Sequence, residues 1–425
     1  MKNKEYTIFE TFVGAGGSHI GFKKNGFKSV YVNDYNLDCL KTLLVNNPEI
    51  KNTAYIDYKS IIDIDVSNLL QNIRLSTGQL DVMFGGIVCK GFSLAGERSP
   101  NDERNYFYHK QLELVKEVQP KISIIENVKA FLNGKVLAQE TPIEIKEKVD
   151  FVWQQLENYK GQKAELRKKN NISNEFLEQG LFLRKEKENL LKILQEENYL
   201  ISVIEDVYKI YNQVGYNVSH KVLNTAWYGS STKRERVIIV ATRKDLPNNF
   251  IFPLPKYHSN EISTKLDFEN IYINTKFLKP ITIGQALSKI DYNNNLDTDN
   301  IAMKHSKKTV DRFKFINPGS NIQERMDDLP EELKISNFYS RGNTMRLDMN
   351  SLSPTLVPGH SNFPVHPTEH RSITVREASV ITGFPINYQF IGSHSKRCEQ
   401  VGNAVPPPLS SAIAKQCIIY LKQLE

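Results

Sequence analysis

Short apolar segments typical of β-strands alternate with helical segments along the first 245 residues of the chain. Strands are predicted at residues 6–9, 29–32, 82–84, 122–125, 218–223 and 237–241. Helices are predicted between them, at about residues 18–25, 36–44, 109–118 and 204–212. This alternation predicts an α/β fold with a doubly wound, mostly parallel sheet, as in Rossmann-like domains.

Two parts of the chain depart from this alternation. From about residue 140 to 197, Lys, Glu, Gln and Leu occur at helical spacing around a turn at Asn170-Asn171-Ile172-Ser173. We expect a helical hairpin inserted into the sheet domain, and its charges are most simply a solvated face. Its buried seam is expected to contain Leu156, Leu166, Leu177, Leu181, Leu190 and Leu194.

Residues from about 246 onward show no repeated strand–helix unit. Asn, Asp, Pro and Tyr are interleaved there with short apolar runs. We therefore expect a catalytic domain made of residues 1–245 and 395–425, and a smaller, irregular domain at 246–394. A chain of 425 residues is long enough for two such domains.

Composition sets broad limits on function. Fifty-five Lys and Arg residues against 48 Asp and Glu give a formal charge of +7, which permits a phosphate-rich partner without requiring one. No apolar run reaches membrane-spanning length, and no signal peptide is recognised, so a cytoplasmic location is expected. The four cysteines form no CxxC pair, which argues against a zinc site or a disulfide framework, and no metal is expected.

A glycine-rich turn joins the first predicted strand to its helix. The turn reads Phe12-x-Gly14-x-Gly16-Gly17, and glycines there let the backbone approach a ligand at a helix N-terminus. Asp34 ends the next strand, where an acid can hold ribose hydroxyls, and Tyr35 could pack on an adenine. The alternative for Asp34 is that it only caps the following helix.

A cysteine and a carboxylate follow two neighbouring strands. Cys89 lies in a glycine-rich loop, where Lys90 favours the thiolate over the thiol, whose usual pKa is about 8.5. Glu126 follows an apolar strand, and burial there would raise its pKa and suit it to donate a proton to a ring nitrogen. The alternative is that Cys89 is a buried structural thiol.

Two arginines, Arg234 and Arg236, come just before the strand at 237–241. On an extended segment this spacing puts both on one face, with Lys233 and Glu235 on the other. The arginines could be ordinary surface charge. Alternatively, Arg236 would contact a base carbonyl, and Arg234 the base or a backbone phosphate.

Taken together, these segments resemble the motifs of the DNA cytosine-5 methyltransferase family, in the family's order. The matching segments are 12–17, 33–35, 85–96, 126–128, 232–236, 371–378 with 383–385, and 400–406. Three of the motifs depart from the family. The catalytic loop has Ile87-Val88-Cys89-Lys90 where Pro-Pro-Cys-Gln is usual, Thr232 replaces a glutamine, and the acid of the third strand is either Asp57 or replaced by Ser60.

The resemblance implies transfer of a methyl group from S-adenosyl-L-methionine to carbon 5 of cytosine in double-stranded DNA. Cys89 would attack carbon 6 of a flipped-out base, while Glu126 assists at N3. The cofactor site would be formed by Phe12, Gly14, Gly16, Gly17, Asp34, Tyr35, Asp57, Val88, Asn403 and Val405. A monomer that pairs with a restriction endonuclease of the same specificity would fit the family's habit.

Two other functions remain open from the sequence. A family relative methylates cytosine in transfer RNA, but the Cys-Phe-Thr signature expected for it is missing, since no cysteine lies between Cys89 and Cys398. The altered catalytic loop also leaves open a DNA-binding protein without activity. In the irregular region, an ion pair between Arg376 and Glu377 is expected to fix a helix, with a DNA contact by Arg376 as the weaker alternative.

Overall fold

The computed structural model describes residues 5–87, 99–169, 171–262, 276–336, 342–359 and 362–425. Within these ranges a seven-stranded sheet has the order β3-β2-β1-β4-β5-β9-β8. Its parallel part contains β1 (Tyr6–Thr11), β2 (Phe27–Asn33), β3 (Tyr55–Asp57), β4 (Val82–Gly86) and β5 (Ile122–Val128). β9 (Glu235–Arg243) lies antiparallel to both β5 and β8 (Tyr216–Asn224), so the predicted, mostly parallel α/β sheet is confirmed.

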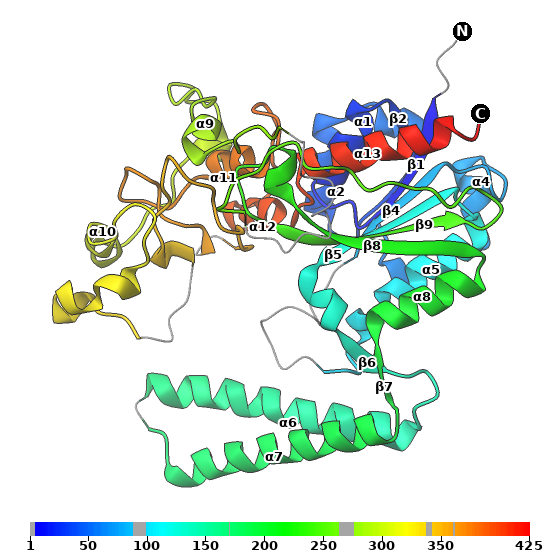
Figure 1. Ribbon diagram of the computed structural model, residues 1–425. Coiled ribbons are helices and arrows are strands. Elements are labelled where there is room, and N and C mark those ends of the chain that lie inside the picture. Colours follow the sequence, from blue (N-terminus) through cyan, green and yellow to red (C-terminus); the bar gives the residue numbers. More distant parts are fainter. Residues whose placement is uncertain (1–4, 88–98, 170, 263–275, 337–341, 360–361) are drawn as a thin grey trace.

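Helices cover both faces of this sheet (Figure 1). On one face lie α5 (Phe107–Val118) and α8 (Val203–Gln213), and on the other α1 (Gly17–Lys24) and α13 (Pro407–Lys422). The C-terminal helix α13 packs alongside α1, which brings the two ends of the chain together. α2 (Leu37–Asn46) covers the end of β2 through Leu40 and Leu43.

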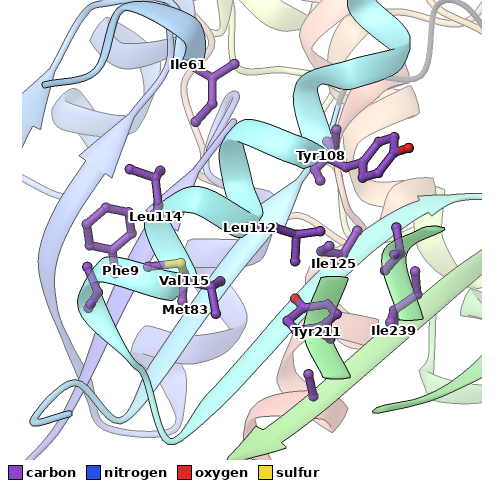
Figure 2. Packing of buried hydrophobic residues seen from close by; sticks show 14 of the residues in the cluster. Phe9, Ile61, Met83, Tyr108, Leu112, Leu114, Val115, Ile125, Tyr211 and Ile239 are labelled. Atoms are coloured by element: carbon purple, nitrogen blue, oxygen red, sulfur yellow. The ribbon is translucent and has the colours of Figure 1, made fainter. Parts of the chain in front are cut away.

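The core forms because alternate residues of each strand face opposite helical layers. Phe9 and Met83 face α5, while the neighbouring Ile8 and Val82 face α1 and α13. Figure 2 shows Leu112 and Val115 of α5 on the face of the sheet that contains Phe9 and Met83. Each such side chain contributes about 1.5–3 kcal/mol when fully buried.

The helical insertion is present, and its seam differs from the prediction. α6 (Ile143–Lys168) and α7 (Asn174–Glu196) lie antiparallel below the sheet, with the short strands β6 (Lys135–Leu137) and β7 (Leu200–Ser202) paired at their base (Figure 1). Leu156, Leu190 and Leu194 are buried as expected, and Leu166 is half-buried. Leu177 and Leu181 are 40 % and 64 % exposed, so their placement in the seam was wrong.

The position of Gly180 explains why Leu177 and Leu181 lie outside the seam. A Cβ atom on Gly180 would clash with the ring of Tyr159, so Gly180 faces α6. Because successive residues on a helix are rotated by about 100°, Leu181 points away from a seam that contains its neighbour Gly180. The same rotation separates Leu177 from Phe176, whose ring stacks on Tyr159 with centroids 4.5 Å apart.

The region from 246 to 394 is irregular, as expected, with short helical elements. These are α9 (Ile283–Leu287), α10 (Lys307–Phe313), α11 (Val375–Thr382) and the 3₁₀ turns Thr298–Asn300, Ile322–Asp328, Glu331–Leu333 and Gly342–Thr344. One small core surrounds Phe313 and Ile322. A second joins α9 and α11 to α12 (His394–Asn403) and reaches Ala15 in the glycine turn.

The expected ion pair between Arg376 and Glu377 is wrong. Arg376 pairs with Asp297 at 2.7 Å, whereas Glu377 pairs with Arg371 at 2.8 Å. Both helix residues are buried, and neighbouring positions on a helix point in directions about 100° apart, so each meets a different partner.

Among the described residues, no helix combines the length and the apolar character that a membrane span requires.

Candidate active site

The glycine turn between β1 and α1 has an unusual backbone. Phe12, Gly14 and Gly16 have φ angles of 50°, 55° and 88°, a region that favours glycine and strains other residues. The turn is fixed by two backbone bonds, from Val13 N to the carbonyl oxygen of Asn33 and from Gly16 N to that of Val13, both at 3.0 Å. A strained backbone held by its surroundings is common at functional sites.

The C-terminal segment returns to this turn, as the sequence predicted. A Cβ atom on Gly17 would clash with the carbonyl oxygen of Val405, so only glycine permits this approach. Ser410 adds a hydrogen bond of 3.0 Å from its hydroxyl to the carbonyl oxygen of Gly17. Val405 is half-buried, while Asn403 ends α12 with an exposed side chain.

Asp34 lies beside the glycine turn and orients it. Its carboxylate accepts hydrogen bonds from Gly14 N at 2.8 Å and from Asn36 N at 2.9 Å. Burial raises the pKa of Asp34, although these two N–H donors act in the opposite direction. Asn36, rather than Asp34, caps α2, so the capping alternative for Asp34 was wrong. Tyr35 is 61 % exposed.

Asp57 ends β3, directly beside the end of β2. Its backbone oxygen accepts from Asp34 N at 3.3 Å, so the two acids are neighbours across the strand pair. Its carboxylate accepts from the hydroxyl of Tyr31 and from Lys59 N, each at 2.9 Å. The other candidate for the third strand, Ser60, is half-buried three residues further on.

Glu126 and Arg236 form a buried ion pair between β5 and β9. Arg236 Nε lies 2.8 Å from Glu126 Oε1, and the two residues are 8 % and 6 % exposed. Burial raises the pKa of Glu126, because loss of solvation outweighs the opposing charges of Arg236 and Arg234. The carboxyl group can therefore hold a proton at a pH where an exposed glutamate has lost it.

Arg234 and Arg236 are both buried, with Lys233 and Glu235 more exposed, as the alternation predicted. Arg234 Nη1 donates to the carbonyl oxygen of Gly402 at 2.6 Å, which ties β9 to α12. The side chain is only 4 % exposed, and its contact with the base or a backbone phosphate stays a prediction. Arg234 thus holds the C-terminal return in place.

These separate groups converge on Gly86 at the end of β4. A Cβ atom on Gly86 would lie 3.5 Å from the oxygen of Phe12, 3.6 Å from Val405 Cγ2 and 3.8 Å from Glu126 Oε2. One residue further along the chain, the carbonyl oxygen of Ile87 accepts a hydrogen bond of 3.3 Å from Asn127 Nδ2. Val88 and Cys89, predicted to act here, lie outside the described residues.

Tyr388 also belongs to this site, and sequence reasoning missed it. Its hydroxyl donates to the carbonyl oxygen of Ala15, in the middle of the glycine turn, at 2.6 Å. The only signal was its position three residues after Gly383-Phe384-Pro385, a segment that had already been singled out. That segment gave no indication of a contact with residues near the N-terminus.

Comparison with known proteins follows the same pattern along the chain. The family profile described as C-5 cytosine-specific DNA methylase matches residues 6–179 and 182–419. Type II methyltransferase M.Eco47II of Escherichia coli is 26 % identical over 436 residues, covering 100 % of this chain and 81 % of the relative. Type II methyltransferase M.DdeI of Desulfomicrobium norvegicum is 24 % identical over 444 residues, covering 98 % and 89 %.

Solved structures agree on the fold. A proposed DNA modification methyltransferase encoded within an Escherichia coli prophage has a TM-score of 0.62 at 18 % identity, covering 98 % of this chain and 100 % of the other. A mutant of Spodoptera frugiperda DNMT2 has a TM-score of 0.54 at 14 % identity, covering 97 % and 100 %. The family predicted from the motifs is confirmed, and the chain belongs to the C-5 cytosine-specific DNA methylases.

Proposed function

We propose that this enzyme transfers a methyl group from S-adenosyl-L-methionine to carbon 5 of a cytosine within a specific sequence of double-stranded DNA. The observation that carries this proposal is the convergence on Gly86 of the glycine turn, the C-terminal return and Glu126. A cofactor held by the turn would thus lie next to a carboxyl group that can hold a proton. Gly86, where these groups meet, is three residues before Cys89 in the sequence. Methyl transfer to a cytosine requires this juxtaposition.

The residues around the glycine turn fit S-adenosyl-L-methionine. Among the described residues, no atom comes within 4 Å of a Cβ built on Gly14, so this side of the turn is open to a ligand. Phe12, Gly14, Asp34 and Val405 would hold the cofactor, and exposed Tyr35 could cover its adenine. When bound there, the cofactor supplies an electrophilic methyl group.

The protein's own groups must make cytosine reactive, because its carbon 5 is a poor nucleophile. The thiolate of Cys89 would form a bond to carbon 6 while Glu126 gives a proton or hydrogen bond to N3. Carbon 5 then carries the electron pair that forms the new carbon–carbon bond. Loss of the proton on carbon 5 to a base, followed by departure of the thiolate, restores the ring.

Arg236 has a positioning role in this scheme. Its guanidinium lies 2.8 Å from Glu126 Oε1 and limits the directions in which the carboxyl group can point.

The target carbon of cytosine is stacked inside the DNA duplex, so the base must be rotated out at a cost of a few kcal/mol. The irregular region at 246–394 would recognise the DNA sequence, and residues 1–245 with 395–425 would carry the chemistry.

Both relatives named above are type II methyltransferases. On this basis we propose that the enzyme is the modification half of a restriction–modification system, with an endonuclease acting at the same site. The protein is proposed to work as a monomer in the cytoplasm.

Incubation with methyl-labelled S-adenosyl-L-methionine tests the proposal. We expect label in duplex DNA and none in transfer RNA, and bisulfite sequencing of the product should locate one recurrent sequence. Cys89→Ser should abolish the transfer, whereas Cys39→Ser, at a half-buried position in the first turn of α2, should leave it intact. Label in transfer RNA alone would contradict a DNA substrate, and DNA binding without label would contradict an active enzyme.

A further inference from the structure

Tyr388 connects two regions that are far apart in the sequence. It is 373 residues away from Ala15, whose carbonyl oxygen accepts a hydrogen bond of 2.6 Å from the Tyr388 hydroxyl. The same hydroxyl oxygen would lie 2.7 Å from a Cβ atom on Gly16, so it presses against the turn itself. One face of the glycine turn is therefore formed by a residue from the irregular region.

The ring of Tyr388 is held firmly. It is 4 % exposed and packs against Phe384 and Phe390, with ring centroids 5.1 and 5.5 Å away. Burial raises the pKa of Tyr388 above its usual value of 10, so the hydroxyl keeps its proton and remains a donor.

The backbone of Tyr388 is fixed by the buried charges of α11. Arg376 Nη1 donates to the carbonyl oxygen of Tyr388 at 2.7 Å, and Arg376 is paired with Asp297 at 2.7 Å. A continuous series of contacts thus runs from Asp297, through Arg376 and Tyr388, to Ala15. It begins in the region proposed to recognise DNA and ends at the turn proposed to hold the cofactor.

We propose that Tyr388 is a positioning residue that sets the shape of the glycine turn for S-adenosyl-L-methionine. The inference rests on the proposed function, because it takes the turn to be the cofactor site. Ala15 lies between Gly14 and Gly16, both of which have positive φ angles. Other bonds of the turn hold the N–H groups of Gly14 and Gly16, whereas the Tyr388 hydroxyl holds the carbonyl of Ala15 between them. Without the hydroxyl, the carbonyl of Ala15 loses its donor and the turn can adopt other conformations, which weakens binding.

Tyr388→Phe tests this inference because it removes the hydroxyl and keeps the packed ring. Tyr216→Phe is the matched control. The Tyr216 hydroxyl also donates to a backbone carbonyl, that of Pro120, at 2.7 Å, and Tyr216 is also buried, but it lies in β8 away from the turn. Both variants lose one buried hydroxyl–carbonyl bond, so a purely structural effect should be similar in the two.

Isothermal titration calorimetry with S-adenosyl-L-methionine should show about five- to tenfold weaker binding for Tyr388→Phe than for Tyr216→Phe. In steady-state assays the KM for the cofactor should rise by the same factor, while the KM for DNA stays within twofold of the control. Thermal unfolding should give similar Tm values for the two variants.

Three results would overturn the inference. Equal cofactor affinity in the two variants would reduce Tyr388 to a structural residue, and a parallel loss of cofactor and DNA affinity would indicate general damage. If the unaltered protein failed to bind S-adenosyl-L-methionine, the proposed function would itself be wrong, and the inference would fall with it.

Discussion

Glu126→Gln is expected to lower the rate of methyl transfer by about 10²–10⁴-fold, the usual contribution of a general acid. Glutamine keeps the size of the side chain and can still lie beside Arg236, but its amide can only donate a hydrogen bond to N3 and cannot transfer a proton to it. Because the pKa of Glu126 is raised, the protonated form is lost as pH rises through that pKa. The single-turnover rate should therefore decline on the alkaline side, and the residual rate of the variant should lack this decline.

Glu235→Gln is the control for this experiment. Glu235 is one residue before Arg236 in the sequence, half-buried, and its carboxylate pairs with Lys129 at 3.0 Å, away from Gly86. The control should keep the rate and its pH dependence. A Glu126→Gln enzyme within about threefold of the unaltered rate would rule out proton donation by this residue.

Arg236→Met is expected to reduce the free energy of unfolding by about 3–5 kcal/mol at pH 8, because it leaves a buried carboxyl group without its charged partner. Without the guanidinium, the pKa of Glu126 in the folded protein should rise further. The folded protein then keeps its proton at pH values where the unfolded chain, with a glutamate pKa of about 4.3, has lost it.

The sign of the pH dependence follows from this difference. A folded state that binds more protons than the unfolded state becomes less stable as pH rises. The pKa of Glu126 is raised in the unaltered protein too, so both proteins lose stability alike just above the unfolded pKa. The deficit of the variant should be smallest at acidic pH and should grow between the folded pKa of the unaltered protein and the higher folded pKa of the variant. Urea denaturation at several pH values would measure it, with Lys129→Met, which breaks a more exposed ion pair, as a control that loses at most about 1 kcal/mol. A deficit that did not change with pH would contradict the assignment.

Local patterns predicted most of the sheet. The strands β1, β2, β4, β5, β8 and β9 were predicted because their apolar periodicity follows directly from which faces the sheet buries. The three-residue strands β3, β6 and β7 were missed, because such short segments show no periodicity. The antiparallel direction of β9 was not specified, since strand direction depends on how the chain crosses the sheet. The exposure of Leu177 and Leu181 was missed because both have helical spacing, whereas the face of α7 that meets Tyr159 contains Phe176 and Gly180.

The candidate site was predicted in part. Its motifs placed Glu126, Asp34 and Val405 at strand ends and turns, and the structure brings Glu126 and Val405 to Gly86 and Asp34 to the glycine turn. Contacts between segments far apart in the sequence could not be predicted, because a single sequence does not show which partner each buried arginine contacts. The prediction paired Arg376 with Glu377, whereas the structure pairs it with Asp297. Arg234 was predicted to contact the base or a backbone phosphate, and nothing in the sequence indicated its bond to the carbonyl oxygen of Gly402.

The central claim is that Cys89 bonds covalently to carbon 6 of a flipped-out cytosine. A duplex carrying 5-fluorocytosine at the target position tests it most directly, because fluorine on carbon 5 blocks the proton loss that releases the thiolate. With S-adenosyl-L-methionine present, the account predicts a complex that survives denaturing electrophoresis, and peptide mapping by mass spectrometry should place the DNA on Cys89. An adduct on any other residue, or one still formed by Cys89→Ala, would contradict the account.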